Sequence, residues 1–299
     1  MNTPLVSIIV LHWRYIERTK ICIEHLRLLD YPSYQVVLVD NGSHNGSFEE
    51  LQQIFPEIQT LALTENRGFA GGVNPAIYQA LQQGADYVVL LNNDTLVPKD
   101  FLTQLVTVHQ QHPLIGVLSP RVVHDQQPDI LAGLGCRIQK YTIELIGWDT
   151  HMHEYEKHLP ILLDAVFGCA MLIPCNIFEK VGLFDERFFF YYEDVDFCQR
   201  VRACGYQVGY LADVIVRHAV GSSTRHIRGL RDFYLARSRQ IFFRKHRHGI
   251  IWIGYLIHET LDALRVIGRK LTLGEYAQAL GYTTGVMVGL VLAYLEFNR

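Results

Sequence analysis

The chain has 299 residues, of which 49% are hydrophobic and 19% are charged, and its formal net charge is −3. This length and apolar content are enough for a sizeable core and exclude an intrinsically disordered chain. The nearly balanced charge excludes a nucleic-acid-binding protein that acts through bulk positive charge.

The first half of the chain alternates apolar runs with helical patterns. Nearly continuous apolar runs, typical of strands buried on both faces of a parallel sheet, lie at 6–11, 34–39, 60–63 and 87–91. Helical patterns lie between these runs, at 19–29, 48–55 and 75–83. This order predicts an α/β fold, with an open parallel sheet and helices on both of its faces.

The alternation loosens beyond Gly116, and the elements become harder to predict. Further strands are expected at 117–119, 122–123, 142–146 and 165–173. Helices are expected at 175–181, at 195–204 and over most of the tail from Ile250. The second half therefore completes the sheet and ends in a helical tail.

Neither the cysteines nor the N-terminus indicates export. The six cysteines form no CxxC pair and no metal-binding spacing, so we expect reduced, buried thiols. The first residues enter a strand directly, without a basic segment or a cleavage site, so we expect no signal peptide. These features predict a cytoplasmic protein.

Polar residues follow several of the predicted strands. These residues are His12, Asp40, Asn66 and the segment 92–94. In open α/β sheets, ligands bind beyond the carboxyl ends of the strands. The four groups are therefore expected to converge on one edge of the sheet.

The segment Leu90–Thr95, LLNNDT, ends a buried strand with two amides and a carboxylate. A hard divalent cation takes oxygen ligands of this kind and neutralises the charge of a diphosphate. Asp94 would be the carboxylate ligand, and Asn92 could contact the metal, a ribose or a sugar. The alternative is an Asx-turn that caps a helix starting near Pro98.

Two further loops on this edge could bind parts of a nucleotide. The Asp40 carboxylate could accept a hydrogen bond from a nucleobase imide, although Asp40–Ser43 also suits a simple turn. The glycine-dense loop 66–72 could approach a phosphate closely before a helix, with Asn74 as its N-cap and Pro75 at its first position. A tight turn without a ligand is the alternative for this loop.

Carboxylates and a histidine complete the candidate chemistry. Three carboxylates, at 193, 194 and 196, follow five aromatic residues at 188–192. They could cap a helix, or one could be a general base whose pKa is raised in a partly apolar pocket. His218 follows another strand, where it is either structural or a ligand that completes a metal site with Asp94.

Taken together, these segments resemble glycosyltransferase family 2, most closely its bacterial rhamnosyltransferase-like branch. The matching segments are VSIIVLHW at 6–13, VVLVDNGS at 36–43, NRGFAGGVN at 66–74, LLNNDT at 90–95, GLFDERFFFYYEDVDFCQRVRACGY at 182–206 and VIVRHAVGSS at 214–223. The resemblance implies the GT-A fold, a Rossmann-like open mixed sheet flanked by helices, with a helical C-terminal tail. It spans most of residues 5–245.

The resemblance also implies a role for each site residue. Asp40 would bind uracil or thymine, Asp94 and His218 would hold Mn²⁺ or Mg²⁺, and Asp194 would be the catalytic base. Further contacts to the nucleotide and donor would come from His12, Asn41, Asn66, Arg67, Gly68, Gly71, Asn92 and Asn93. Glu193 and Trp148 would lie on the acceptor side.

The implied reaction is inverting transfer of rhamnose or another hexose from a dTDP- or UDP-sugar to a saccharide or lipid-linked saccharide acceptor, in cell-surface polysaccharide synthesis. Residues 1–248 would form the catalytic domain, with a nucleotide-binding half at 1–115 and an acceptor-side half at 116–248. Residues 249–299 would be a helical extension. Asn92 replaces the first aspartate of the family's metal motif, and Asn74-Pro75-Ala76 replaces an Asn-x-Gly sequence.

Two other functions are open at this point. A nucleotide-sugar-binding or scaffold subunit of a polysaccharide assembly complex could keep the fold without catalysis, although it would not need Asp94, Asp194 and His218 together. An NAD-dependent enzyme would carry GxGxxG after the first strand, and this chain does not.

The C-terminal region is basic and then apolar. Residues 225–247 carry eight arginines and lysines against Asp232 alone, which suits either a solvated helix face or contact with an anionic lipid or phosphorylated substrate. Residues 276–295 carry no charge, and Gly281, Gly285 and Gly289 permit close helix packing. The alternatives for residues 225–299 are peripheral contact with the cytoplasmic face of a membrane, packing on this protein or in a homodimer, and a membrane span.

Overall fold

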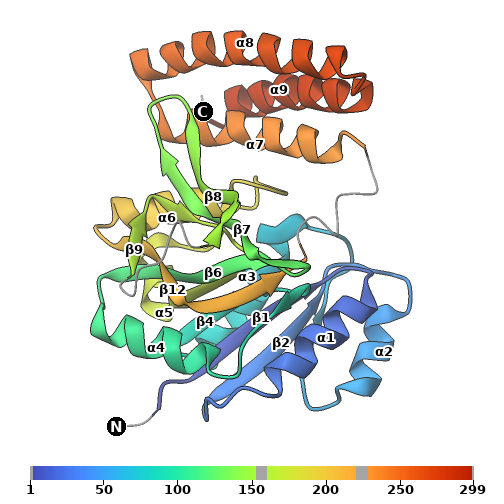
Figure 1. Ribbon diagram of the computed structural model, residues 1–299, viewed down its shortest axis with the longest axis vertical. Helices are drawn as coiled ribbons and strands as arrows, with labels where there is room; N and C mark the ends of the chain where they lie inside the picture. Colours follow the sequence, from blue (N-terminus) through green and yellow to red (C-terminus); the bar gives the residue numbers. More distant parts are fainter. Residues whose placement is uncertain (1–2, 153–159, 220–227, 298–299) are drawn as a thin grey trace. The chain divides into compact units, whose positions relative to one another are not determined.

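The computed structural model describes residues 3–152, 160–219 and 228–297, and they form two compact units (Figure 1). The sheet unit comprises Met1–Arg137, Leu145–Glu186 and Asp194–Val220. The helical unit comprises Ile138–Glu144, Arg187–Glu193 and Gly221–Arg299. The domain boundary predicted after residue 248 lies within the helical unit.

The strands and helices are numbered in chain order. The strands are β1 (Val6–His12), β2 (Tyr34–Asp40), β3 (Gln59–Ala62), β4 (Tyr87–Asn92), β5 (Thr95–Leu96), β6 (Ile115–His124), β7 (Gln127–Ile138), β8 (Ile143–His151), β9 (Ile161–Leu163), β10 (Ala165–Val166), β11 (Ala170–Pro174) and β12 (Gln207–His218). The helices are α1 (Ile16–Leu26), α2 (Ser47–Ile54), α3 (Gly68–Gln82), α4 (Phe101–Gln111), α5 (Cys175–Val181), α6 (Glu193–Ala203), α7 (Leu230–His246), α8 (Gly249–Thr272) and α9 (Tyr276–Phe297).

The sheet is mixed, and its strand directions determine where the loops meet. Hydrogen bonds join the strands in the order β10-β7-β6-β11-β4-β1-β2-β3, and β12 pairs with β6, β5 and β9. Strands β4, β1, β2 and β3 are parallel, and β11 is antiparallel to β4 and β6. Because β12 is parallel to β6, its end lies on the same edge as the ends of β1, β2 and β4. The predicted α/β class with an open sheet is confirmed.

Both faces of the sheet are covered by helices, as Figure 1 shows. Val6, Ile8 and Val10 of β1 belong to one core cluster with residues of α1, α2 and α4. Ile9 lies between them and points to the opposite face, because side chains alternate along a strand. Helix α3 packs against β1 and β2 and covers that second face. Burial on both faces explains why these strands are almost continuously apolar.

The strands expected in the second half of the chain differ from the structure in two places, and one strand was missed. The two short strands expected at 117–119 and 122–123 are a single strand, β6. Strand β7 was not predicted, although it pairs with β6. The strand expected at 165–173 is interrupted at Phe167–Cys169, between β10 and β11. A glycine within a strand pattern often marks such a break, and Gly168 lies at this one.

The helical unit is built on α7, α8 and α9. Most of the described basic residues between 228 and 247 form ion pairs or hydrogen bonds within this unit. Arg239 of α7 pairs with Glu259 at 3.2 Å and with Asp262 at 2.9 Å, both on α8. Arg237 and Arg244 donate to backbone carbonyls of the same unit. These arginines therefore brace the unit and do not form a solvated face. Arg225 and the matching segment at 220–223 lie outside the described residues.

Candidate functional site

The predicted site residues gather on the carboxyl edge of the sheet because the strand register brings them there. His12 at the end of β1 lies opposite Asp40 of β2, and Leu11 lies opposite Asn92 of β4. On the other side of β4, Leu91 lies opposite Ala170, the first residue of β11. Neighbouring strands are about 4.8 Å apart, so Asp40 and the end of β4 are separated by about 10 Å.

Asp40 is the last residue of β2 and Asn41 follows it, and their side chains make different contacts. Both carboxylate oxygens of Asp40 accept the Ser43 N–H, at 3.3 and 3.2 Å, and each has a further lone pair available. The buried Asn41 amide is used within the protein, because its Oδ1 accepts the Arg67 N–H at 2.9 Å. Its Nδ2 donates to Asn66 Oδ1 at 3.1 Å and to the Gly68 carbonyl at 2.9 Å. Asn41 therefore fixes the turn that begins α3.

The start of α3 differs from the prediction. The helix begins at Gly68, and Pro75 lies inside it. The expected N-cap, Asn74, instead bonds to the backbone N–H and carbonyl of Phe184, 110 residues away. Gly68 has a positive φ of 70°, which suits glycine, and a Cβ on Gly72 would lie 2.7 Å from Leu11 Cδ1. The glycines of this segment thus let a helix approach β1 closely.

Arg67 and Gly71 lie beside this helix start. The Arg67 guanidinium pairs with Glu186 at 2.6 Å, and both side chains are partly exposed. A Cβ on Gly71 would lie 2.8 Å from Arg67 Cβ, so a side chain there would displace the arginine. The guanidinium is therefore held near the start of α3 and remains accessible to a ligand.

The LLNNDT segment meets His218 where β5 pairs with β12. His218 lies opposite Thr95 in this pair, and its Nε2 is 3.1 Å from Asp94 Oδ1. The same Nε2 is 3.5 Å from Asn92 Nδ2. Asn93 faces another way and donates to Thr19 Oγ1 at 2.8 Å. The structure thus brings Asp94, Asn92 and His218 together.

Asp194 lies near the same segment. Its Oδ2 accepts the Gly168 N–H at 2.8 Å, and its Oδ1 accepts the Val195 N–H at 2.8 Å. The next residue after Gly168, Cys169, accepts the Asn92 N–H at 2.9 Å through its carbonyl. The 167–169 break in the sheet therefore links Asp194 to the end of β4.

The pKa values reflect this proximity. Burial raises the pKa of the Asp194 carboxyl above its ordinary value, and the two backbone N–H donors oppose this effect. Burial, with the charges of both Asp94 and Asp194, raises the pKa of the Cys169 thiol to about 12. One thiol is thus within electrostatic reach of both carboxylates.

The two acceptor-side candidates, Trp148 and Glu193, differ in exposure. Trp148 on β8 packs edge-on against Phe167, with ring centroids 5.7 Å apart, and both side chains are partly exposed. Phe167 directly precedes Gly168, the residue that binds Asp194. Glu193 is the first residue of α6 and is buried. Sequence reasoning did not identify Phe167 or Gly168, and the glycine in the strand pattern was the available signal.

His12 lies on the edge but is fully buried. Its Nδ1 bonds to Thr19 Oγ1 at 2.7 Å and its Nε2 to Ser47 Oγ at 2.8 Å. Both ring nitrogens are therefore used within the protein, and the imidazole ties α1 and α2 to β1. Burial lowers the pKa of His12 to about 4, opposed by the charge of Asp40, so the ring is neutral at neutral pH.

This lowered pKa predicts an acid-dependent loss of stability. The unfolded chain binds the His12 proton near pH 6.5, whereas the folded chain binds it only at about pH 4. The unfolded state thus holds more protons in this window, and folding weakens as the pH falls through it. Relative to a His12→Gln variant, wild type should lose up to about 3 kcal/mol of unfolding free energy. Urea unfolding across pH 4–7 measures this, and a constant difference would contradict it.

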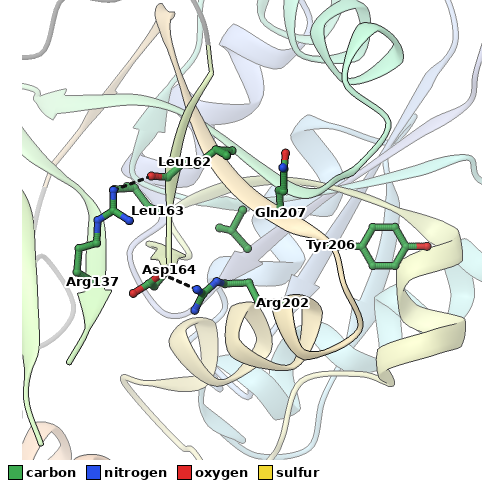
Figure 2. Close-up of a pocket in the computed structure, with 8 residues that line it drawn as sticks. Arg137, Leu162, Leu163, Asp164, Arg202, Tyr206 and Gln207 are labelled. Atoms are coloured by element: carbon green, nitrogen blue, oxygen red, sulfur yellow. Dashed lines mark hydrogen bonds and ion pairs between the residues drawn. The ribbon is translucent and has the colours of Figure 1, made fainter. Parts of the chain in front are cut away.

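A hollow of about 200 Å³ in the sheet unit lies away from these residues (Figure 2). Figure 2 shows Arg202 paired with Asp164 and Arg137 bonded to the Leu162 carbonyl, at 2.8 and 3.1 Å. Gln207, which also lines the hollow, begins β12, whereas His218 ends it. A smaller cavity of about 50 Å³ is lined by Asp94 itself. The convergence of polar groups, and not the size of a cavity, therefore marks the candidate site.

The protein could supply part of the ligand set of a divalent cation. Among the described residues, no group of three or more His, Cys, Asp or Glu side chains could hold a metal alone. The Asp94 and His218 pair supplies one carboxylate and one imidazole. Mg²⁺ and Mn²⁺ are commonly bound by one or two protein ligands together with substrate phosphates and water. The donor set therefore fits a cation that is shared with a bound diphosphate.

Comparison with known proteins finds several relatives that are named for sugar transfer. The chain is 23% identical to the dTDP-rhamnosyl transferase RfbF of Shigella flexneri, over 87% of this chain and 88% of the relative. It is 29% identical to the low-salt glycan biosynthesis hexosyltransferase Agl10 of Haloferax volcanii, over 58% of this chain and 55% of the relative. It is 26% identical to the N-acetylglucosaminyl-diphospho-decaprenol L-rhamnosyltransferase of Mycobacterium tuberculosis, over 63% and 67% of the two chains.

Solved structures show the same fold. The mannosyltransferase PcManGT from Pyrobaculum calidifontis, in complex with GDP-Man and Mn²⁺, aligns over 99% of this chain and 88% of its own, with a TM-score of 0.59 and 18% identity. TarS of S. aureus aligns over 96% and 81%, with a TM-score of 0.56 and 14% identity. The fold is therefore GT-A. The glycosyl transferase family 2 model matches residues 7–180. The chain thus belongs to glycosyl transferase family 2.

Proposed function

We propose that the protein transfers a hexose, with rhamnose as the first candidate, from a dTDP- or UDP-sugar to a saccharide or lipid-linked saccharide, with inversion at the anomeric carbon. The observation that supports this is the gathering of Asp40, the Asp94 and His218 pair, and Asp194 on one edge of the sheet. The relatives named for rhamnosyl and hexosyl transfer support the donor class and a role in cell-surface polysaccharide synthesis.

The donor would lie along the edge from β2 toward α6. The Asp40 carboxylate would accept the imide N–H of uracil or thymine. The start of α3, with Asn66 and Gly68, and the partly exposed Arg67 would face the diphosphate, since helix N-termini and guanidinium groups favour anions. In this arrangement the loops that contact the donor would be held in position by four further residues, His12, Asn41, Gly71 and Asn93.

Asp94 and His218 would hold a divalent cation together with the diphosphate, and Asn92 would contact the cation or the sugar. When bound, the cation would supply charge neutralisation to the leaving diphosphate. Two neutral amides, Asn92 and Asn93, precede Asp94, so the protein supplies a single carboxylate here. The diphosphate itself would therefore provide much of the binding, and affinity for the cation without nucleotide should be low.

Asp194 would be the general base. It would take the proton from an acceptor hydroxyl while that oxygen bonds to the anomeric carbon. The bond from the anomeric carbon to the diphosphate oxygen would break on the opposite face, which inverts the configuration. Burial raises the pKa of Asp194, and a higher pKa makes its carboxylate a stronger base.

The acceptor side would include Glu193, at the start of α6, and Trp148. Sugars stack on aromatic faces through apolar contact, and the Trp148 and Phe167 pair offers two partly exposed rings beside the Asp194 partner Gly168.

Trp148→Ala should raise the acceptor KM by roughly 10-fold, since about 1.4 kcal/mol of ring contact is lost, and leave the donor KM unchanged. Steady-state kinetics with each substrate varied in turn measures this split. Trp252→Ala in α8 is the matched control and should change neither KM. Equal changes in both KM values would contradict an acceptor role.

The activity is tested by offering the protein dTDP- and UDP-sugars, with Mn²⁺ or Mg²⁺, and saccharide acceptors. A donor at about 100 times its Kd should stabilise the fold by about 2.7 kcal/mol, seen as a higher melting temperature. Transfer should then follow with the stabilising donor only. Stabilisation without transfer or donor hydrolysis would favour the non-catalytic binding subunit. The absence of any stabilisation would contradict both functions.

A further inference from the structure

Helix α8 places its apolar residues outward and its acids inward. Glu259 and Asp262 pair with Arg239 of α7, and the buried Tyr255 hydroxyl donates to Gln240 of α7 at 2.9 Å. The opposite side of the helix carries large apolar side chains at spacings of three, four, four and three residues. They are 51–78% exposed and comprise Ile250, Ile253, Ile257, Leu261 and Leu264. We call them the α8 stripe.

Helix α9 shows the same separation of faces. Its glycine face packs closely against α7 and against Gly229, the residue before α7. A Cβ on Gly281 would lie 2.2 Å from the Gly229 carbonyl oxygen, and a Cβ on Gly285 would lie 2.3 Å from the Phe233 carbonyl oxygen. The opposite face carries apolar side chains that are 58–69% exposed. These are Leu280, Met287, Val291 and Tyr294, the α9 stripe.

The exposed charges on α8 are of one sign, whereas α9 carries one exposed acid, Glu296, whose carboxylate lies 3.9 Å from the Arg187 guanidinium. Along α8, all of which is described, the exposed charged residues are Arg265 and Arg269. Lys270 is buried and pairs with Asp232 and Glu275. From Tyr276 to Leu295 no residue carries a charge. The exposed surface of α8 therefore combines large apolar side chains with positive charge and no exposed acid.

We propose that the helical unit docks on the surface of an anionic lipid bilayer, with the α8 stripe in the interface and Arg265 and Arg269 at the headgroups. Exposed apolar patches of this extent mark interaction surfaces in soluble proteins. Amphipathic helices with basic residues bind anionic bilayers through both buried apolar area and charge. The inference goes beyond glycosyl transfer, because it needs no residue of the carboxyl edge.

The packing of α9 favours docking over spanning. By length and composition alone, helix α9 could cross a membrane, and 22% of its apolar 18-residue segment is buried within the protein. Crossing would draw it away from α7, whose backbone its glycine face meets closely, or bring α7 into the bilayer. Helix α7 carries Asp232, Arg237 and Arg239, which are costly to bury in lipid. Lying in the interface preserves the whole unit.

The charges favour lipid over a second copy of the chain. A homodimer that pairs the α8 stripe of one copy with that of another would bury the apolar side chains, but α8 has no exposed acid to pair with Arg265 or Arg269. Anionic headgroups satisfy both the apolar and the cationic requirement. Arg237, Arg239 and Arg244 of α7, which the sequence indicated for lipid contact, are used within the unit, so we assign the cationic contact to α8.

The test is flotation of the full chain with vesicles of phosphatidylcholine alone and with an equal mixture of phosphatidylcholine and phosphatidylglycerol. Wild type should float with the mixed vesicles and much less with the neutral ones. The double variant Ile257→Gln/Leu264→Gln should reduce binding at least about 10-fold. Arg265→Gln/Arg269→Gln should reduce it about fivefold per arginine and remove the preference for phosphatidylglycerol.

The matched control is Leu28→Gln/Leu114→Gln, which makes the same change at leucines that are 68% and 61% exposed in the sheet unit. It should float like wild type, and circular dichroism should show that all variants keep the wild-type helix content. Failure of wild type to float, or equal flotation of the stripe variant, would overturn the proposal. A dimer in sedimentation velocity that the stripe variant dissociates, without vesicle binding, would assign the α8 stripe to a second copy.

Discussion

Replacing Asp194 with asparagine is expected to lower kcat by ~10²–10⁴-fold, the usual contribution of a general base, and to leave the donor KM unchanged. The amide keeps an oxygen that can accept one of the two backbone N–H bonds from Gly168 and Val195. The variant should therefore fold, and its donor-induced thermal shift should match wild type. Steady-state kinetics together with thermal shifts measures the two effects separately.

The pH profile gives a second signature of the same residue. Because burial raises the pKa of Asp194, the acid side of the kcat/KM profile should fall at a higher pH than an ordinary aspartate, near 4, would give. The residual activity of Asp194→Asn should lack this limb. Asp129→Asn, an exposed carboxylate on β7, is the matched control and should keep both rate and profile. Wild-type kcat in Asp194→Asn would show that another group takes the proton.

Replacing Asp94 with asparagine is expected to abolish metal-dependent binding of the donor. Asp94 is the single carboxylate at the end of β4, and an amide is a much weaker ligand for Mn²⁺ or Mg²⁺. The cation concentration for half-maximal donor-induced stabilisation should rise roughly 100-fold or more, by comparison with the 10–100-fold cost of losing a supporting residue. Thermal shifts over a Mn²⁺ titration, at fixed donor, measure this without reference to turnover.

Companion measurements separate the metal from the local fold. His218→Gln should show a smaller loss in the same titration, since Asp94 is still present. A chelator should remove the wild-type activity, and added Mn²⁺ or Mg²⁺ should restore it. Asp125→Asn changes a carboxylate that lines the same small cavity but pairs with Arg217, and it should have a weak effect. Full activity in the presence of chelator would contradict a role for the cation.

The sheet could be predicted because its sequence signal is local. Runs such as Val6–Leu11 and Tyr87–Leu91 are apolar at nearly every position because both faces of the sheet are covered, and polar residues follow them at the carboxyl edge. The likeness to the family placed Asp94 and His218 together, 124 residues apart in the chain. Periodicity contains no such long-range information.

The start of α3 could not be predicted because tertiary contacts determine it. Pro75 and Asn74 have the local signature of a helix start, yet the Asn41 amide fixes the preceding turn and the helix begins at Gly68. Asn74 is instead held by Phe184, from another part of the chain. The hydrogen bonds of the buried Asn41 amide, and not the local capping signals, therefore determine where this helix begins.

His12 and the basic stretch show the same limit. A polar residue at a strand end suggests a ligand contact, but both His12 nitrogens bond to hydroxyls that only the packing of α1 and α2 on β1 brings near. The arginines of α7 suggest a charged surface, but acids on α8 neutralise one of them. Which side of a helix is covered depends on its neighbours, which the sequence of that helix does not contain.

A crystal structure of the protein with dTDP and Mn²⁺, with anomalous data at the manganese edge, tests most directly whether Asp40, Asp94 and Asp194 serve one donor site. We predict a manganese peak between the Asp94 carboxylate and the diphosphate, with the thymine imide bonded to Asp40 and the open end of the diphosphate facing Asp194. A nucleotide bound elsewhere, such as the hollow beside Arg137 and Arg202, with no peak at Asp94, would contradict the account.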